Sequence, residues 1–346
     1  MRDETSLKNT PLSRFLSHNQ TKSDLTKYLS EKVQLYNKES DKIIITSAAG
    51  YTNSNIDIGP FPENNHEEAD TLMICLGVIA AERHSKKAEI TFFSPDTDVL
   101  ILLIANFDRL PTNTRMSMVS GIKQIEPIWR SLGPERSKAL LGLHAFSGTD
   151  NTGRFAGVGK KTWMKLFLQS SDAIIDALRG LCAQEYISEN HELNLAKFVC
   201  QAYRPKGLQI ESIPDLRWYM FCKYMAESDK LPPTLGALRQ HIARARLQAY
   251  VWGQATVFHQ NLLDPLENGY YKSDERLVPT ITELPPAPEA IIEMVMCRCK
   301  GNCSTNRCSC HSKESKCTDL CQCSDLCEND IDTGHSNVDL DDDSDD

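Results

Sequence analysis

Nine cysteines crowd into one short stretch near the end of the chain. Three pairs follow the pattern Cys-x-Cys, and a single cysteine follows each pair. The nine residues are Cys297, Cys299, Cys303, Cys308, Cys310, Cys317, Cys321, Cys323 and Cys327. Thiolates are the soft ligands that Zn²⁺ prefers, and structural zinc sites are closed tetrahedra. Three tetrahedral ions need twelve sulfur bonds, which nine thiolates supply when six bind one ion each and three bridge two ions. The stretch therefore predicts a cluster of about three structural zinc ions.

A disulfide scaffold is the main alternative for this stretch. An odd number of cysteines leaves one thiol without a partner, and the start Met1-Arg2-Asp3-Glu4 has no apolar signal region that would direct the chain to an oxidising compartment. Metal is therefore the favoured interpretation. Nine thiolates with three Zn²⁺ carry a net charge of −3, which five neighbouring basic residues offset: Arg298, Lys300, Arg307, Lys313 and Lys316.

The cysteine spacing resembles that of the tesmin-type cysteine-rich (CXC) domain. That domain runs CxC, C, CxC, C, CxC, C and closes with asparagine, as Cys327-Glu328-Asn329 does here. The resemblance covers about a tenth of the chain, and it implies DNA binding, as in several nuclear proteins. Those proteins often carry two tandem copies and a tyrosine just before the second CxC pair, whereas this chain has one copy with Arg307 at that position. A purely structural zinc module is the alternative.

Two pairs of acidic residues stand where a second kind of metal site would form. Glu68 and Asp70 open an apolar helix expected over 71–83, where the helix dipole favours acids, so that helix capping alone would explain one or two of them. Asp96 and Asp98 follow an expected strand over 88–93, and in an extended segment residues two apart face the same way. Ligands of open α/β sheets bind at this carboxyl edge. Both carboxylates are therefore predicted to face one site.

A glycine-rich turn lies farther along the chain, where Gly157 and Gly159 precede Lys160 and Lys161. A Gly-x-Gly turn at the start of a helix presents free backbone N–H groups that can hold a phosphate, and two lysines stand beside it. The alternative is a solvated helix start whose glycines only relieve a tight turn.

Four motifs in this order resemble the catalytic half of the flap-endonuclease (XPG-I) branch of PIN-like nucleases. They are Glu68-Ala69-Asp70, Asp96-Thr97-Asp98, Gly148-Thr149-Asp150 and Gly157-Val158-Gly159-Lys160-Lys161. The resemblance covers roughly residues 42–168. It implies that Lys160 and Lys161 contact phosphates in a helix-turn-helix, and that five carboxylates coordinate metal: Glu68, Asp70, Asp96, Asp98 and Asp150.

The chemistry of clustered carboxylates agrees with that resemblance. Oxygen-rich sites suit Mg²⁺ or Mn²⁺, and two such ions about 4 Å apart would activate water and stabilise the leaving oxygen of a phosphodiester. The family also has an earlier strand that carries the first catalytic aspartate, and no counterpart lies upstream of Ile43. A nuclease fold that is incomplete at its N-terminal end, with weakened activity, is therefore expected.

Alternating strand and helix patterns place these motifs in an α/β fold, with a PIN-like parallel sheet covered by helices on both faces. We expect a buried strand over 42–46 followed by a loop to 65, a strand over 115–119, helices over 124–132 and 134–146, and a helical region over 171–260. Two apolar faces of that region are predicted to be core: Trp218, Phe221, Cys222 and Met225, then Leu238, Ile242, Ala245 and Ala249. Buried thiols are expected at Cys75, Cys182, Cys200 and Cys222. A basic stretch, Arg239, His241, Arg244 and Arg246, is predicted to be a solvated face.

Changes in composition divide the chain into six expected parts. They are a polar helical segment (1–41), the PIN-like core with its helix-turn-helix (42–170), a helical extension (171–262), a proline-rich linker (263–295), the zinc-cluster domain (296–329) and an acidic, disordered tail (330–346).

The overall composition limits the possible functions. The chain has 346 residues, 40% of them hydrophobic, which is enough for a sizeable core. No apolar run approaches the roughly 18–20 residues of a membrane span, so a nuclear or cytoplasmic protein without a membrane partner is expected. The net charge of −9 argues against a surface that binds nucleic acid throughout, although a local patch can bind. We expect a protein that associates with nucleic acid, DNA in particular. The alternatives are an active Mg²⁺-dependent structure-specific endonuclease and a non-catalytic protein-interaction scaffold.

Overall fold

The computed structural model divides the chain into two compact units, Met1–Ile281 and Thr282–Asp346. It describes residues 11–36, 42–48, 51–55, 63–83, 88–111, 114–119, 123–183, 186–224, 230–283, 296–318, 321–323 and 327–329. The boundary between the units falls inside the range predicted as a linker, 263–295. The predicted acidic tail, 330–346, lies outside the described residues.

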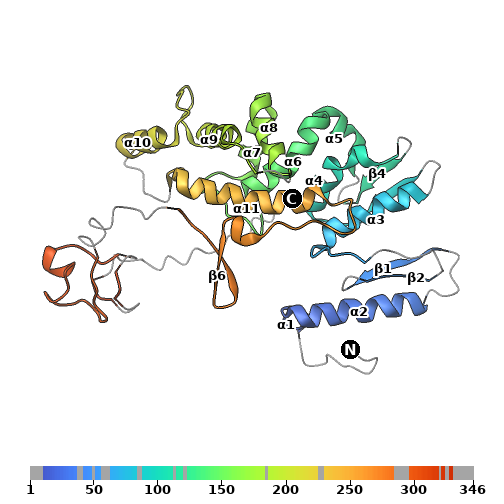
Figure 1. The fold of residues 1–346 in the computed structure, drawn as a ribbon, viewed down its shortest axis with the longest axis horizontal. Helices are drawn as coiled ribbons and strands as arrows, with labels where there is room; N and C mark the ends of the chain where they lie inside the picture. Colours follow the sequence, from blue (N-terminus) through green and yellow to red (C-terminus); the bar gives the residue numbers. More distant parts are fainter. Residues whose placement is uncertain are drawn as a thin grey trace. The chain divides into compact units, whose positions relative to one another are not determined.

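The first described elements are two helices and a hairpin (Figure 1). They are α1 (Leu12–Leu16), α2 (Asn19–Tyr36), β1 (Ile45–Ala48) and β2 (Tyr51–Ser54). The Ser30 hydroxyl donates to Thr46 Oγ1 at 2.8 Å, and the Gln34 amide donates to the Asn53 carbonyl at 3.2 Å, so α2 is tied to the hairpin by polar contacts. The buried strand predicted over 42–46 is therefore wrong. The strand starts later, pairs antiparallel with the next segment, and leaves its apolar side chains partly exposed.

The next elements form a small three-stranded sheet with helices. They are α3 (Ala69–Arg83), β3 (Glu89–Phe92), α4 (Thr97–Ala105), β4 (Arg115–Met118), β5 (Lys123–Gln124), α5 (Ile125–Leu132) and α6 (Pro134–Ser147). The pair β3–β4 is parallel with Ile90 opposite Met116, and β4–β5 is antiparallel. A mixed α/β fold is thus confirmed. Among the described residues, the sheet expected to be parallel contains a single parallel pair.

The start of α4 differs from the predicted extended segment. Ser94-Pro95 ends the strand, and Asp96 caps the helix because its Oδ1 accepts the Asp98 N–H at 2.9 Å. Asp98 therefore lies in the first helical turn rather than two places along a strand. The remainder of α4 is almost wholly apolar and buried, which anchors these two acids to the core.

The remaining helices pack around α6. They are α7 (Lys160–Leu168), α8 (Asp172–Gly180), α9 (Glu189–Tyr203), α10 (Ile213–Tyr224) and α11 (Leu235–Gly253). Helix α6 contacts α4, α5, α7, α8 and α11, and ten of its residues are buried. Gly142 lets α6 and α8 pack closely together, because a Cβ at this position would lie 1.9 Å from the Leu178 carbonyl oxygen of α8. Helix α6 is the centre of the unit.

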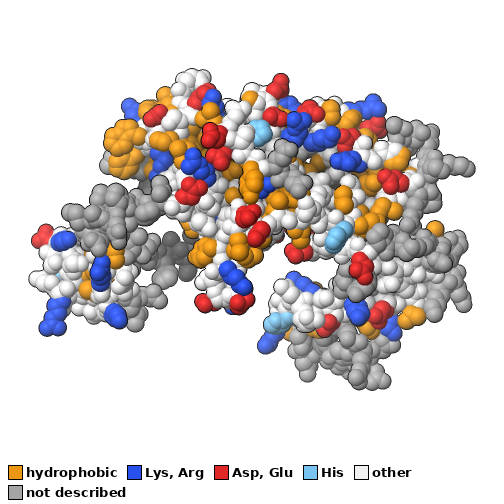
Figure 2. Space-filling model, in the orientation of Figure 1, with side chains coloured by type: hydrophobic (Ala, Val, Ile, Leu, Met, Phe, Trp, Pro, Cys, Tyr) orange, Lys and Arg blue, Asp and Glu red, His pale blue; other side chains and the backbone are white. Residues whose placement is uncertain are grey.

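One of the two predicted apolar faces is not in the core. Trp218 is 68% exposed, Phe221 is 49% exposed and Cys222 is also exposed, while Met225 lies outside the described residues. Helix α10 buries its first turns instead, through Ile213 and Leu216, and its exposed apolar surface is visible in Figure 2.

The second face is confirmed. Leu238, Ile242, Ala245 and Ala249 of α11 are all buried. Of the cysteines expected in the core, Cys75 and Cys200 are buried and Cys182 is partly buried.

The basic stretch on α11 is mostly buried, which corrects the prediction of a solvated face. His241 Nε2 lies 2.7 Å from the Phe146 carbonyl oxygen, and burial lowers the His241 pKa to about 4. Arg244 donates to the carbonyls of Gly269 and Thr280 at 3.1 and 2.6 Å. Arg246 donates to Asn268 Oδ1 at 2.7 Å. Arg239 remains largely exposed.

The Arg244 contacts hold a hairpin where a linker was expected. Its strands are β6 (Tyr270–Ser273) and β7 (Arg276–Pro279), and a short 3-10 turn, η3 (Pro265–Glu267), precedes them (Figure 1). Pro279 is the last residue of β7, so the prolines of this range do not prevent a hairpin from forming before them. The linker range is therefore ordered up to the end of the first unit, and residues 284–295 lie outside the described residues.

The second unit has very little regular structure among its described residues, with one 3-10 turn, η4 (His311–Lys313). Its core cluster consists of cysteines alone, of which five are buried: Cys297, Cys303, Cys308, Cys310 and Cys317. No described helix in either unit has the length and apolar character needed to cross a membrane.

Candidate functional site

The cysteines of the second unit gather into overlapping sets of four. Within each set every sulfur lies within 4.8 Å of the others, close enough for one ion to contact all four. The four sets are Cys297/Cys299/Cys303/Cys308, Cys303/Cys317/Cys323/Cys327, Cys297/Cys308/Cys310/Cys317 and Cys297/Cys317/Cys321/Cys323. These clustered cysteines could hold a metal ion such as zinc, and all nine cysteines take part.

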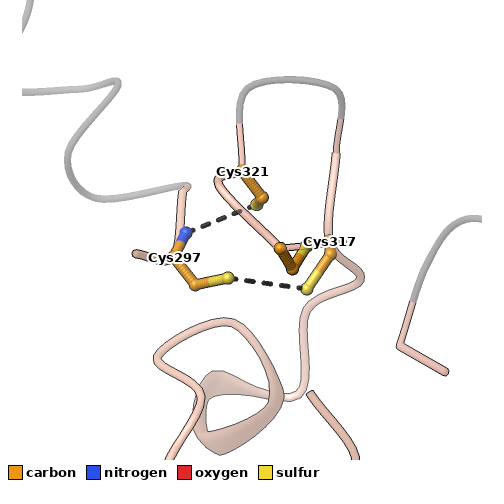
Figure 3. Close-up of side chains that lie close together, drawn as sticks. Cys297, Cys317 and Cys321 are labelled. Carbon is orange, nitrogen blue, oxygen red and sulfur yellow. Dashed lines mark hydrogen bonds between the residues drawn. The ribbon is translucent and has the colours of Figure 1, made fainter. Parts of the chain in front are cut away.

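One further set of four follows from these distances. Cys310 Sγ lies 3.7 Å from Cys321 Sγ, and the last two sets place each of these sulfurs within 4.8 Å of Cys297 and Cys317. The set Cys297/Cys310/Cys317/Cys321 is therefore also compact. Figure 3 shows Cys297 facing both Cys317 and Cys321, with 3.9 Å between the sulfurs of Cys297 and Cys317.

Three of these sets together use six cysteines once and three cysteines twice, which is what twelve metal–sulfur bonds from nine cysteines require. The sets begin with Cys297/Cys299/Cys303/Cys308, continue with Cys303/Cys317/Cys323/Cys327 and end with Cys297/Cys310/Cys317/Cys321. Together they contain all nine residues. Cys297, Cys303 and Cys317 each belong to two of the sets, and the other six cysteines belong to one. This is the pattern of three bridging and six terminal thiolates that three tetrahedral ions need.

Backbone and side-chain donors surround several of these sulfurs. The N–H groups of Cys297 and Thr318 donate to Cys321 Sγ at 3.3 and 3.4 Å. The Asn329 amide donates to Cys317 Sγ at 3.4 Å and to the Ser315 carbonyl at 3.0 Å. Buried Asn329, the last described residue, is therefore tied to one of the shared cysteines.

These donors decide which thiols ionise most readily. Burial opposes ionisation of Cys321, but the N–H donors of Thr318 and Cys297 outweigh it and lower the Cys321 pKa to about 7. Burial likewise opposes ionisation of Cys308, and the His311 N–H at 3.5 Å helps to lower its pKa to about 6. Cys303 and Cys317 have raised pKa values, first because of burial and then because of neighbouring thiols. A cation is therefore needed before all the sulfurs become thiolates.

A second polar cluster lies in the first unit, between α3, α4, α6, α7 and α11. Asp98 Oδ1 lies 2.6 Å from His144 Nε2, and the Lys160 ammonium lies 2.7 Å from His144 Nδ1. The His144 hydrogen bond lowers the Asp98 pKa. Burial lowers the Lys160 pKa to about 8. Asp98, His144 and Lys160 thus form a continuous chain of hydrogen bonds.

Glu68 is held on the other side of this cluster by three donors. The Trp252 indole donates to Glu68 Oε2 at 2.8 Å, and the Gln248 and Asn151 amides donate to Oε1 at 3.0 and 3.4 Å. Glu68 also lines a cavity of about 430 Å³. The carboxylate is therefore both fixed in place and open to a bound molecule.

The predicted acidic residues lie near one another without forming a compact ligand set. Burial raises the Asp70 pKa, and the charges of Asp96, Asp98 and Glu68 raise it further, so these four carboxyls interact. Among the described residues, however, every set of three or more ligand atoms within 4.8 Å of one another is made of cysteines. Asp150 is exposed and its charge acts on Lys160.

The glycine-rich turn is placed as expected at the start of α7. Gly157 has φ +71°, which favours glycine, and Gly159 is the residue that precedes the helix. The Lys160 ammonium turns back to His144, whereas the Lys161 side chain is exposed. Both lysines nevertheless line one cavity beside His144, so the two predicted phosphate contacts lie next to each other.

No known family, curated protein or solved structure matches this chain.

Sequence reasoning missed His144 and Trp252, which carry much of the polar cluster. His144 is a single histidine in an apolar helix, and its contact with Asp98 spans 46 residues. Trp252 contacts Glu68 across 184 residues. The only local signal is the position of His144, four residues before Gly148-Thr149-Asp150. That position does not indicate which carboxylate the histidine contacts.

Proposed function

We propose that the second unit binds three zinc ions as a module of the CXC type, and that the protein acts in association with nucleic acid, DNA in particular. The observation that carries the zinc proposal is the division of nine cysteines into three compact sets that share Cys297, Cys303 and Cys317. This division meets the ligand count of three tetrahedral ions without an unused thiol.

The proposal of nucleic-acid association rests on the resemblance of both regions to DNA-acting families and on the charge around the cysteines. Five basic side chains of the described second unit are exposed, and Figure 2 shows Lys and Arg side chains on this unit: Arg298, Lys300, Arg307, Lys313 and Lys316. Such side chains bind phosphates and release counterions. We propose the nucleus as the place of action, with the cytoplasm as the alternative.

Elemental analysis and native mass spectrometry of the full chain test the zinc proposal. We expect close to three zinc ions per chain. One ion or none would overturn it.

Duplex binding at increasing salt tests the second part of the proposal. Lys300→Ala with Arg307→Ala should weaken binding and reduce its salt dependence, because each variant removes a phosphate contact. Lys138→Ala with Lys272→Ala is the matched control, since these exposed cations lie in the first unit. Absence of salt-dependent binding by the unmodified protein would instead support a protein-interaction scaffold.

A second candidate function is slow, metal-dependent hydrolysis of phosphodiesters by the first unit. The observation that favours it is the proximity of four acids: burial raises the Asp70 pKa, and the charges of Asp96, Asp98 and Glu68 raise it further. Glu68, Asp70 and Asp98 would hold Mg²⁺ or Mn²⁺, because oxygen donors suit these ions and a hydrated ion needs only one or two direct carboxylates. A bound ion of this kind supplies an activated water and stabilises a leaving oxygen.

A flap- or nick-containing duplex tests this candidate. We expect at most slow cleavage stimulated by Mn²⁺, and loss of cleavage in Asp98→Asn. Rapid cleavage in Mg²⁺ that Asp98→Asn abolishes would promote the protein to an active endonuclease. Cleavage that survives Asp98→Asn would show that the acidic cluster is not its source.

A further inference from the structure

The cavity of about 430 Å³ beside Glu68 has mainly apolar walls. They come from α11, from the segment that follows this helix and from the hairpin β6–β7. Six of the lining side chains are apolar: Leu247, Val251, Leu262, Leu263, Pro265 and Leu277. A cavity of this size and character, with a few polar groups in its wall, is typical of sites for small organic molecules.

Two opposite charges line this cavity, and the first is that of Glu68. Its donors in the described part of the chain are the Trp252 indole and the Gln248 and Asn151 amides, and all three groups are neutral. A carboxylate has about four lone-pair positions, so Glu68 can accept a further donor. The negative charge is therefore held in place without a cationic partner among the described residues.

The second charge is that of Arg244, which lines the same cavity and is only 8% exposed. Its hydrogen bonds to described residues both use Nη1, which donates to the Gly269 and Thr280 carbonyls at 3.1 and 2.6 Å. These acceptors are neutral, and the Nε and Nη2 donors have no partner among the described residues. Burial lowers the Arg244 pKa, so an anion beside the guanidinium would stabilise its charged form. A carboxylate is the partner that guanidinium geometry suits best.

We propose that this cavity binds a small zwitterion with an apolar body, whose ammonium group contacts Glu68 and whose carboxylate contacts Arg244. Each charge of such a ligand supplies the oppositely charged partner that the neutral neighbours of Glu68 and Arg244 do not. The apolar body packs against the leucine side chains of the walls. This inference goes beyond the proposed function, because it depends on neither zinc nor nucleic acid and needs no metal ion at Glu68.

Free leucine and ε-aminocaproate are the probes for this inference. The two molecules are isomers with the same two charges, which lie close together in leucine and at opposite ends of the chain in ε-aminocaproate. The full chain, loaded first with zinc, is titrated with each probe, and saturation-transfer NMR of the probe measures the dissociation constant. We expect at least one isomer to bind, and the tighter of the two reports the spacing between the Glu68 and Arg244 charges.

Analogues with a single charge are the matched controls on the unmodified protein. Isoamylamine is leucine without its carboxylate, and isocaproate is leucine without its ammonium group. Amylamine and caproate are the corresponding analogues of ε-aminocaproate. We expect each analogue to bind about 10-fold or more weakly than its parent, because a hydrogen-bonded charge is lost. Failure of both zwitterions to bind, or equal binding by an analogue and its parent, would overturn the proposal.

Glu68→Gln and Glu67→Gln give a second readout as a matched pair. Both residues line the cavity, but Glu67 is exposed and has no hydrogen-bond partner among the described residues. We expect Glu68→Gln to weaken binding of the preferred zwitterion about 10-fold or more, and Glu67→Gln to leave it unchanged. The analogue without an ammonium group needs only Arg244, so its binding should be the same in both variants and in the unmodified protein. Equal loss of zwitterion binding in the two variants would overturn the assignment of the ammonium contact to Glu68.

Discussion

Replacement of a shared cysteine should damage the zinc module more than replacement of an unshared one. Cys303 belongs to two of the three compact sets, whereas Cys299 belongs to one of them. Both residues lie in the same segment, and serine differs from cysteine by a single atom. Cys303→Ser and Cys299→Ser therefore form a matched pair.

The sharing of Cys303 sets the expected size of the difference. Loss of Cys303 removes two of the twelve metal–sulfur bonds and leaves two ions with three thiolates each. Loss of Cys299 removes one bond and affects one ion. We expect about one tightly held zinc ion in Cys303→Ser and about two in Cys299→Ser, compared with about three in the unmodified chain.

Native mass spectrometry of the three proteins, after dialysis against a weak chelator, measures these numbers directly. The same comparison applies to Cys317→Ser against Cys323→Ser. Equal zinc loss in shared and unshared variants would refute the assignment of bridging residues. A total of one ion in the unmodified protein would refute the three-ion cluster itself.

Four other predictions concern zinc retention and stability. Asn329→Ala should speed zinc loss to a chelator without changing the starting zinc content, because a donor to a sulfur worth about 1–3 kcal/mol is lost. Asp70→Asn should raise the thermal midpoint at pH 7, since burial and neighbouring acids raise this pKa and the charge costs stability above it; the gain should vanish in acid. Asp98→Asn should lower the midpoint at pH 7, because its hydrogen bond to His144 lowers this pKa and stabilises the fold above it. Gly142→Ala should destabilise the first unit by about 1–3 kcal/mol in thermal denaturation, whereas Gly159→Ala, whose Cβ would meet nothing within 4 Å, should not.

The cysteine cluster that could hold a metal ion could be predicted from sequence because all of its residues lie within one short segment. Their types and spacing state the ligand count directly, and the structure brings the same nine residues together. The assignment of bridges could not be predicted, since it depends on distances such as the 3.7 Å between Cys310 and Cys321. Local spacing restricts which residues can meet but does not choose among several compact sets.

Burial of polar residues was the main point at which sequence patterns failed. Arg244 and Arg246 were expected to be solvated, yet carbonyl and amide oxygens of residues 268–280 receive their donors. Trp218 was expected in the core, yet α10 packs through its other residues. Periodicity identifies the faces of a helix, but which face is covered depends on segments far away in the chain.

The acidic cluster was predicted in part. The positions of Asp96 and Asp98 next to a strand end were predicted, whereas the helix start at Thr97 was not. An aspartate before an apolar run can cap a helix as readily as it extends a strand. Here Asp96 caps the helix, because its Oδ1 accepts the Asp98 N–H. The contacts of His144 and Trp252 needed the fold, because they join α6 and α11 to Asp98 of α4 and to Glu68, which precedes α3.

The all-cysteine core of the second unit determines which sequence changes it can accept. In the first unit, leucine, isoleucine and methionine can exchange for one another at a modest cost, since these side chains have similar volumes. In the second unit the residues between the cysteines, such as 304–307 and 312–316, are exposed and contribute little to the interior. Their identities are therefore open to substitution as far as folding is concerned, but an inserted or deleted residue would move a sulfur by a full chain step of about 3.8 Å. Such a step is as large as the 3.7 Å spacing between neighbouring sulfurs, so this unit should tolerate variation in composition and resist variation in length.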